Sequence, residues 1–164
     1  MFDCILVGAG PAGLACAIEA TQSGLSTVVL EQGGIADAIR RFPVNMTWFS
    51  TPELLEIGGV PFVIPTVRPT RVDTLNYYAR VTQHFGLDVR TLTRVVDITR
   101  GDGAAFRVAT AAGRTFEGAH VIIATGYFDN PVRLGVPGET LPHVRHFYDE
   151  PFLYAGTRVV VVGG

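Results

Sequence analysis

The chain has 164 residues, of which 48% are hydrophobic and 17% charged, which excludes a disordered chain or a polyelectrolyte. Thirteen basic and fifteen acidic residues give a net charge of -2 without a basic cluster, so neither nucleic acid nor a membrane is expected as a partner. The length corresponds to about one domain. The chain has no apolar run of ~20 residues, no signal-peptide pattern and only two cysteines, so the protein is expected to be cytoplasmic.

The first thirty residues predict a strand, a helix and a second strand. Phe2–Val7 is a short apolar run, typical of a strand buried on both faces of a parallel sheet. Residues 11–23 begin with Pro, are rich in Ala and precede Gly24, as expected for a helix with a defined start and stop. Thr27–Leu30 is a second buried strand, so residues 2–31 predict one βαβ unit.

The middle of the chain predicts loops followed by a helix. Residues 32–70 are rich in Gly and Pro, with short helical turns expected at residues 36–41 and 52–56. A stretch this long without regular structure is uncommon in a compact domain unless it serves a function. Residues 71–85 predict an amphipathic helix, whose apolar face would carry Val72, Leu75, Tyr78, Ala79, Thr82 and Phe85.

The second half predicts strands. Residues 87–89 are a candidate third strand. Residues 94–99, 106–109 and 114–117 alternate between apolar and polar side chains, which predicts a three-stranded antiparallel meander. Its turns would lie at Gly101-Asp102-Gly103 and at Ala112-Gly113. Residues 120–124 and 158–162 are further apolar runs, each read as a buried strand.

A glycine motif lies between the first predicted strand and helix. Gly8, Gly10 and Gly13 fit G-x-G-x-x-G, and Pro11 and Ala12 occupy the positions between the last two. Gly8 would permit a tight turn, Gly10 would let backbone approach a pyrophosphate, and Gly13 would let the helix pack closely on the strand. The helix N-terminus would then face the phosphates. The alternative is a glycine-rich turn without a ligand.

An acidic residue follows the motif at the spacing that dinucleotide sites use. Glu31, next to Gln32, ends the second strand eighteen residues past Gly13, where a carboxylate accepts a hydrogen bond from a ribose hydroxyl. Such a carboxylate would repel a 2′-phosphate, which disfavours NADP at this first site. The alternative is a solvated glutamate at a strand end.

A third motif is Ala124-Thr125-Gly126, which follows the meander. The ordered set of glycine motif, meander and Ala-Thr-Gly turn resembles flavoproteins with two dinucleotide sites, and this resemblance implies FAD at the first site. Residues 158–162 with Gly163-Gly164 resemble the start of the second site, which implies NADPH. The resemblance implies an α/β Rossmann-like FAD-binding domain, with its N-terminal part at residues 1–150. Residues 151–164 would be a connector and the first strand of a truncated NAD(P)H-binding domain, so the chain is expected to be an N-terminal fragment.

Two segments narrow the resemblance. Residues 42–62 (Phe-Pro-Val-Asn-Met-Thr-Trp-Phe-Ser-Thr-Pro and onward) and residues 141–148 are similar to the thioredoxin-reductase-like bacillithiol disulfide reductases. The family implies electron flow from NADPH through FAD to a small-molecule disulfide, and commonly a homodimer. It also implies that Asn45 and Thr47 line the flavin and that Gln32 and Val95 belong to the cofactor site; for Asn45 and Thr47, ordinary turn residues are the alternative.

The cysteines depart from this family. Its members often carry Cys directly after the motif proline, where this chain has Ala12. Cys16 lies one turn further along the helix, about 6 Å away, and a small core residue is the favoured interpretation over a nucleophile. Cys4 is expected to be buried, too far from Cys16 for a disulfide. Without a C-x-x-C motif, no catalytic residue is assigned.

The remaining candidates are aromatic and histidine side chains. Trp48, Phe49 and Phe62 could wall the flavin ring, although core packing is favoured. His143 and His146 could bind a metal only on a helix, which Pro142 disfavours, so no metal is expected.

The function expected from this sequence is NAD(P)H-dependent, FAD-mediated reduction of a low-molecular-weight disulfide. A flavin monooxygenase is the alternative, but its F-x-G-x-x-x-H pattern fails at His146, where Thr140 and Pro142 stand at the Phe and Gly positions. A second alternative is an inactive FAD-binding fragment.

Overall fold

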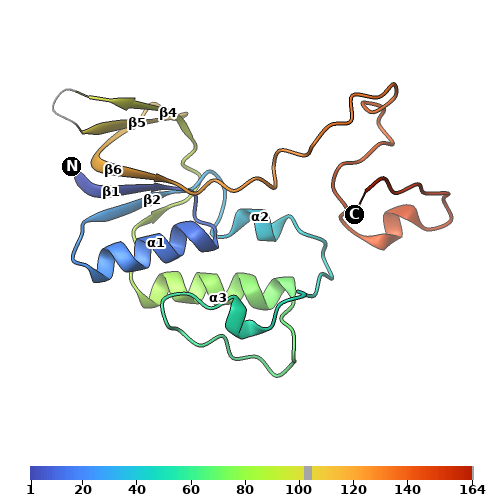
Figure 1. Cartoon of the computed structure of the whole chain (residues 1–164), viewed down its shortest axis with the longest axis horizontal. Coiled ribbons are helices and arrows are strands. Elements are labelled where there is room, and N and C mark those ends of the chain that lie inside the picture. Colours follow the sequence, from blue (N-terminus) through green and yellow to red (C-terminus); the bar gives the residue numbers. More distant parts are fainter. Residues whose placement is uncertain (102–104, 164) are drawn as a thin grey trace.

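The fold is a six-stranded sheet with helices on one face (Figure 1). The computed structural model describes residues 1–101 and 105–163. The strands run in the order β3-β2-β1-β6-β5-β4. Their bounds are β1 Phe2–Val7, β2 Thr27–Leu30, β3 Val89–Arg90, β4 Val95–Arg100, β5 Phe106–Thr110 and β6 Thr115–Ile123. The predicted α/β class, with a parallel sheet and a meander, is confirmed, and the two parts form one continuous sheet.

Strand β6 joins the parallel and antiparallel halves. Its first residues pair antiparallel with β5, from Ala109 opposite Thr115 to Phe106 opposite Gly118. From Gly118 to Ile123 it pairs parallel with β1. The prediction of two separate strands at residues 114–117 and 120–124 is therefore wrong, because the backbone stays extended through Gly118 and changes partner there. Of the predicted meander turns, Asp102 and Gly103 lie outside the described residues.

In the described part of the chain, three α-helices lie between the strands: α1 between β1 and β2, and α2 and α3 between β2 and β3. Helix α1 is Pro11–Gln22, the short helix α2 is Asp37–Arg40 and helix α3 is Arg71–His84. Single 3-10 turns lie at Pro52–Leu54 and Pro151–Tyr154. Helix α3 begins with a capping box in which Thr70 and Asp73 exchange side-chain and backbone hydrogen bonds, and this sets its first residue. None of the helices in the described part of the chain is both long and apolar enough to cross a membrane.

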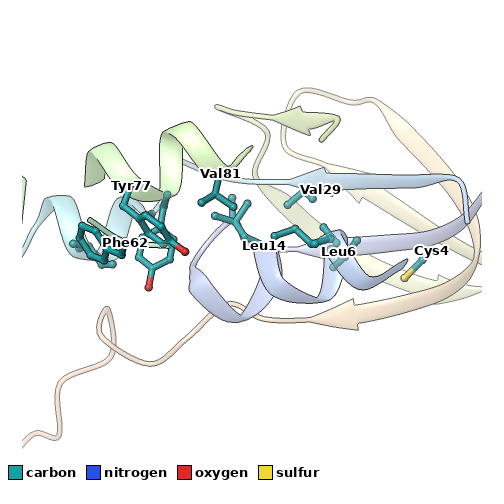
Figure 2. Packing of buried hydrophobic residues seen from close by; sticks show 13 residues of the cluster. Cys4, Leu6, Leu14, Val29, Phe62, Tyr77 and Val81 are labelled. Carbon is teal, nitrogen blue, oxygen red and sulfur yellow. The ribbon is translucent and has the colours of Figure 1, made fainter. Parts of the chain in front are cut away.

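Alternating residues of β1 divide the core into two clusters. Leu6 packs with Leu14 of α1, Val29 of β2 and Val81 of α3, on the face that both helices cover (Figure 2). Ile5 points the other way and packs with Val28, Leu30 and Val108 under the β4–β5 hairpin. Both faces of β1 are buried from Cys4 to Val7, and this part of the strand is a continuous apolar run.

The buried stripe of α3 is shifted from the predicted one. Val72 is exposed, whereas Tyr77 and Val81 are buried and were not on the predicted face. Phe62 stacks on Tyr77 with ring centroids 4.3 Å apart, so the 32–70 loop supplies the apolar cover. This loop packing moves the buried face of the helix toward the loop.

The expected strand at residues 158–162 is wrong for this structure. These residues have no regular secondary structure, and Val160 is 87% exposed. A strand needs a neighbour for its backbone N–H and C=O groups, and none of the six described strands pairs with this segment.

Candidate functional site

The glycine motif forms the turn between the carboxyl end of β1 and helix α1. Gly8 has φ of +108°, and a Cβ atom there would collide with the carbonyl of Ala124. A Cβ on Gly13 would collide with the carbonyl oxygen of Gly8. A Cβ on Gly10 would meet no atom within 4 Å. Gly8 and Gly13 are thus required by packing, whereas the space at Gly10 is open to a ligand.

The start of α1 offers unused hydrogen-bond donors beside this open space. The first helical hydrogen bond runs from the N–H of Leu14 to the carbonyl of Gly10 at 2.9 Å. The N–H groups of Ala12 and Gly13 precede that bond, and Pro11 has no N–H to lose. With the partial positive charge of the helix end, this arrangement fits a diphosphate group.

Glu31 is held beside the same turn. Its side chain is buried, and its two carboxylate oxygens accept hydrogen bonds from the N–H groups of Ala9 and Gly33, both at 2.7 Å. The interpretation as a solvated strand-end residue is therefore wrong. Each carboxylate oxygen has a second lone pair, so Glu31 fixes the turn and can still accept a hydrogen bond from a ribose hydroxyl.

The Ala-Thr-Gly turn and the start of β4 lie at the same edge of the sheet as the glycine turn and Glu31. The N–H of Ala124 donates to the carbonyl of Val7 at 2.8 Å, which places this turn against the glycine motif. The N–H of Thr93 donates to the carbonyl of Glu31 at 2.7 Å, and half-buried Val95 follows two residues later. The glycine turn, Glu31, the start of β4 and the Ala-Thr-Gly turn therefore meet at the carboxyl ends of parallel strands, where open α/β sheets bind ligands.

Asn45 and Thr47 lie elsewhere on this surface. Both are exposed, and Thr47 pairs with Thr70 at the start of α3. Among the described residues, no hydrogen bond joins either side chain to the glycine turn. Their assignment to the flavin site stays a prediction.

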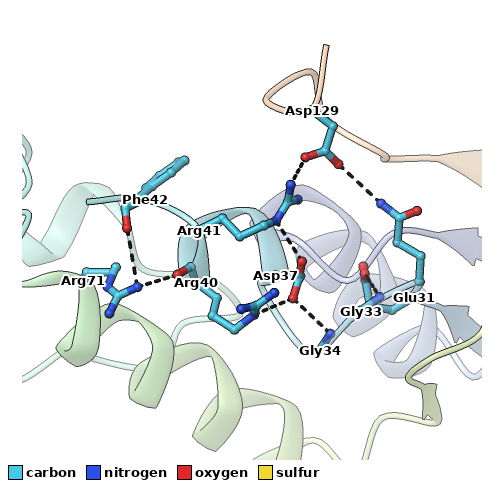
Figure 3. Close-up of polar contacts among 10 residues, drawn as sticks. Glu31, Gly33, Gly34, Asp37, Arg40, Arg41, Phe42, Arg71 and Asp129 are labelled. Carbon is cyan, nitrogen blue, oxygen red and sulfur yellow. Dashed lines mark hydrogen bonds and ion pairs between the residues drawn. The ribbon is translucent and has the colours of Figure 1, made fainter. Parts of the chain in front are cut away.

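One polar network at this edge had no sequence signal. Arg41 donates to Asp37, 3.0 Å away, and forms an ion pair with Asp129, which also accepts from Gln32 at 3.3 Å (Figure 3). The Arg41 guanidinium also lies over the ring of Phe128, 5.6 Å from its centroid. These contacts tie the segment after Ala-Thr-Gly to α2. Neither residue type nor spacing marks these residues, because the contacts depend on how two loops meet.

Aromatic and cysteine candidates have structural roles. Phe62 is buried, and Trp48 is half-buried with its ring 5.8 Å from that of Phe42, as the core interpretation expects, whereas Phe49 is exposed. Both cysteines are free, and Cys16 packs against the core under the helices. Burial, with a smaller contribution from Cys16, raises the pKa of the Cys4 thiol, so its reactive thiolate is disfavoured.

The histidines are not gathered for metal binding. His143 is exposed, and the ring of His146 hydrogen-bonds to Glu139 at 3.0 Å. No cluster of three or more His, Cys, Asp or Glu side chains suited to a metal ion occurs among residues 1–101 and 105–163.

Comparison with known proteins agrees with this geometry. The chain is 38% identical to bacilliredoxin reductase Bdr of Bacillus subtilis over 160 residues, which is 98% of this chain and 49% of that protein. It is 30% identical to a ferredoxin–NADP reductase of Ignicoccus hospitalis, over 100% of this chain and 49% of that protein. The chain thus spans about half the length of the curated relatives it matches.

The chain is also similar to a solved structure of a related enzyme. Bacillithiol disulfide reductase Bdr (YpdA) of Staphylococcus aureus superposes with a TM-score of 0.89 and 34% identity, covering 93% of this chain and 46% of that one. The family model described as pyridine nucleotide-disulphide oxidoreductase matches residues 5–164. The chain therefore belongs to the pyridine nucleotide-disulphide oxidoreductase family.

Proposed function

We propose that this chain forms the FAD-binding part of a flavoprotein that uses NAD(P)H to reduce a low-molecular-weight thiol disulfide. The observation that carries the proposal is the meeting of the glycine turn, Glu31 and Ala124 at one sheet edge. This edge occurs in a chain with a TM-score of 0.89 to a bacillithiol disulfide reductase.

The residues at this edge would bind FAD in parts. The open space at Gly10 and the N–H groups of Ala12 and Gly13 suit the diphosphate. Glu31 suits the adenosine ribose, and its negative charge disfavours a 2′-phosphate at this site. When bound, FAD supplies the transfer of electrons between nicotinamide and disulfide, while the protein binds and orients it.

Further residues complete the proposed FAD site. Gln32 and Val95 would lie toward the adenosine, next to the end of β2. Thr125 and Gly126 follow Ala124 at the glycine turn, whereas Asn45 and Thr47 would reach the flavin ring from the 32–70 loop. No thiol of this chain is assigned to the reaction, because Ala12 replaces the expected Cys and Cys16 packs against the core.

The remaining parts of the proposal concern the whole protein. Residues 1–150 would belong to the FAD domain and residues 151–164 to the connector and first strand of a domain for NADPH. The enzyme would act in the cytoplasm as a homodimer on a small-molecule disulfide. These assignments follow the family resemblance, and the half-length match to Bdr supports a second domain in the relatives.

A flavin-containing monooxygenase is the alternative function. Such an enzyme from Stenotrophomonas maltophilia shares the fold with a TM-score of 0.70 and 29% identity over 76% of this chain. That likeness is weaker than the likeness to Bdr in all three respects. The connector also lacks the F-x-G-x-x-x-H pattern, with Thr140 and Pro142 at its first two fixed positions.

The two functions are separated by the electron acceptor. The gene product that includes these 164 residues should purify with FAD and oxidise NADPH in proportion to added bacillithiol disulfide under anaerobic conditions. A matched reaction with oxygen and an organic sulfide, without disulfide, measures oxygenation. NADPH use coupled to oxygenated product, with no disulfide reduced, would favour the monooxygenase instead.

A further inference from the structure

A cavity is lined in part by Arg41 and Phe128, which belong to the polar network at the carboxyl edge of the sheet. It has a volume of about 650 Å³ and lies between the start of α3, the end of α2 and the connector residues 145–153. This volume is within the ~300–1,000 Å³ of small-molecule sites. Three phenylalanines, Phe42, Phe128 and Phe147, form its apolar wall, with the ring of Phe128 4.8 Å from Phe42 and 5.0 Å from Phe147.

The charged lining of this cavity is predominantly basic. Arg40, Arg41, Arg71 and Arg145 line it, against Asp149 and Glu150. Arg40 and Arg41 pair with Asp37, 2.7 and 3.0 Å away, and Arg41 also pairs with Asp129. Arg145 lies 3.7 Å from Asp149, in an exposed and therefore weak ion pair.

Arg71 differs from the other three arginines. Its Nη1 atom donates to the backbone carbonyls of Arg40 and Phe42, as Figure 3 shows. In the described part of the chain it has no carboxylate partner, and its buried Nε atom has no hydrogen-bond acceptor. A buried, unsatisfied N–H on a charged group is costly, and a bound acceptor would remove that cost.

We propose that this cavity binds the carboxylate or phosphate group of a small anionic molecule. Arg71, fixed by two carbonyls, and Arg145, whose ion pair is weak, would contact the anion. The phenylalanine wall would contact the apolar part of the same molecule. As a deepening of the proposed function, on which this step rests, the cavity would hold the carboxylate end of the disulfide substrate.

Direct binding to the 164-residue chain tests the cavity without any turnover. Isothermal titration calorimetry would compare oxidised glutathione, which carries carboxylates, with neutral 2-hydroxyethyl disulfide. Oxidised glutathione should bind, and its affinity should fall as the salt concentration rises. The neutral disulfide should bind at least tenfold more weakly. A parallel titration uses 2′,5′-ADP, which carries phosphates. Binding of 2′,5′-ADP without binding of oxidised glutathione would identify a nucleotide phosphate as the anion and exclude the disulfide.

Two substitutions are expected to change the binding affinity in opposite directions, which a general loss of folding could not do. Arg145→Ala should weaken binding about three- to tenfold, because one charged contact is lost. Asp149→Asn should strengthen it, since Arg145 loses its competing partner. Arg114→Ala, on the exposed β5–β6 turn, is the matched control and should leave the affinity unchanged.

Two results would overturn the proposal. One is equal affinity for oxidised glutathione and 2-hydroxyethyl disulfide; the other is an affinity that Arg145→Ala and Asp149→Asn leave unchanged. Failure of the proposed function is a different result: no NADPH oxidation by the flavin-loaded gene product with either disulfide. Turnover with both disulfides at equal efficiency would keep the reductase and exclude the anion cavity.

Discussion

The three glycines of the motif meet three different physical demands. Gly8 adopts a left-handed conformation against Ala124, and Gly13 lies against the backbone of Gly8. Gly10 has φ of -77° and ψ of 178°, which any residue adopts, and open space around its Cα. Folding therefore constrains Gly8 and Gly13, whereas the constraint at Gly10 would come from the proposed ligand.

Gly10→Ala should weaken FAD binding without unfolding the chain. An added methyl group meets no protein atom, so the free energy of unfolding should change by less than about 0.5 kcal/mol. The methyl group would occupy the space of the diphosphate, so FAD affinity should fall at least ~10-fold, about 1.4 kcal/mol. Thermal unfolding and FAD fluorescence titration measure the two effects.

Two variants calibrate that experiment. Gly34→Ala also adds a methyl group that meets no protein atom, and it is the matched control for the free energy of unfolding. Gly13→Ala should unfold the chain, because its methyl group collides with backbone. Stoichiometric FAD in Gly10→Ala would remove the glycine motif from the proposed site.

Glu139 and His146 make the connector sensitive to acid. The pKa of Glu139 is lowered from 4.5 to about 2. The largest cause is its hydrogen bond with His146, and the hydrogen bonds from the N–H groups of Leu134 and Gly135 contribute less. A lowered folded-state pKa means that this stabilisation is complete above pH 4.5 and is lost as pH falls toward 2.

His146→Ala should raise the pKa of Glu139 toward its usual value. The pKa is measured by NMR titration of the Glu139 side-chain carboxyl, and amide shifts of Leu134 and Gly135 should follow the same curve. Arg107→Ala, which removes the partner of Glu117 on the distant hairpin, should not change that curve. An unchanged Glu139 titration in His146→Ala would contradict the assigned contact.

At the scale of elements, β6 determines how the two halves of the sheet join. Gly118 pairs with Phe2 on one side and with Phe106 on the other. A Cβ atom there would lie 2.8 Å from the side chain of Ile5, which is fully buried. The absence of a side chain at Gly118 leaves room for the buried side chain of Ile5 where β6 changes its pairing partner.

Gly118→Ala should destabilise the whole sheet. The methyl group overpacks the cluster around Ile5, at a cost of ~1–3 kcal/mol. Urea unfolding measures this change, with Gly34→Ala as the control. Combining Gly118→Ala with Ile5→Val should recover part of the loss if the collision is the cause, whereas additive losses would contradict it.

At the scale of the whole molecule, the 127–163 segment extends away from the sheet (Figure 1). It is held to the body by the Asp129 contacts and by the hydrogen bond from the N–H of Val44 to the carbonyl of Asp149 at 3.1 Å. Its apolar side chains are largely exposed, including Tyr127 and Val132. The described residues thus comprise a packed sheet with the proposed dinucleotide site and an extended segment with exposed apolar side chains.

The 164-residue chain should bind FAD weakly and oxidise no NADPH. The glycine turn, Glu31 and Ala124 form the adenosine and diphosphate side of the site, whereas the exposed 158–162 segment forms no nucleotide site. Flavin content and NADPH oxidation would be compared with Bdr of Bacillus subtilis, of which the match spans 49%. Equal turnover by both proteins would show that these residues suffice.

The sequence by itself determined the local elements and the cofactor motif. Two short apolar runs, an Ala-rich stretch, Pro11 and Gly24 set the first βαβ unit, because residues close in sequence carry the signals that start and end strands and helices. The roles of Gly8 and Gly13 were also predictable, since their φ angle and close packing follow from a strand–turn–helix connection.

Only the tertiary structure decided the features that depend on distant partners. It merged two predicted strands into β6, buried Glu31 between two backbone N–H groups, and left residues 158–162 without a strand. It also brought Arg41 to Asp129 and left Arg71 without a carboxylate partner among the described residues. Hydrogen bonds and charges between loops are set by where the chain returns in space, and no local pattern in the sequence encodes that position.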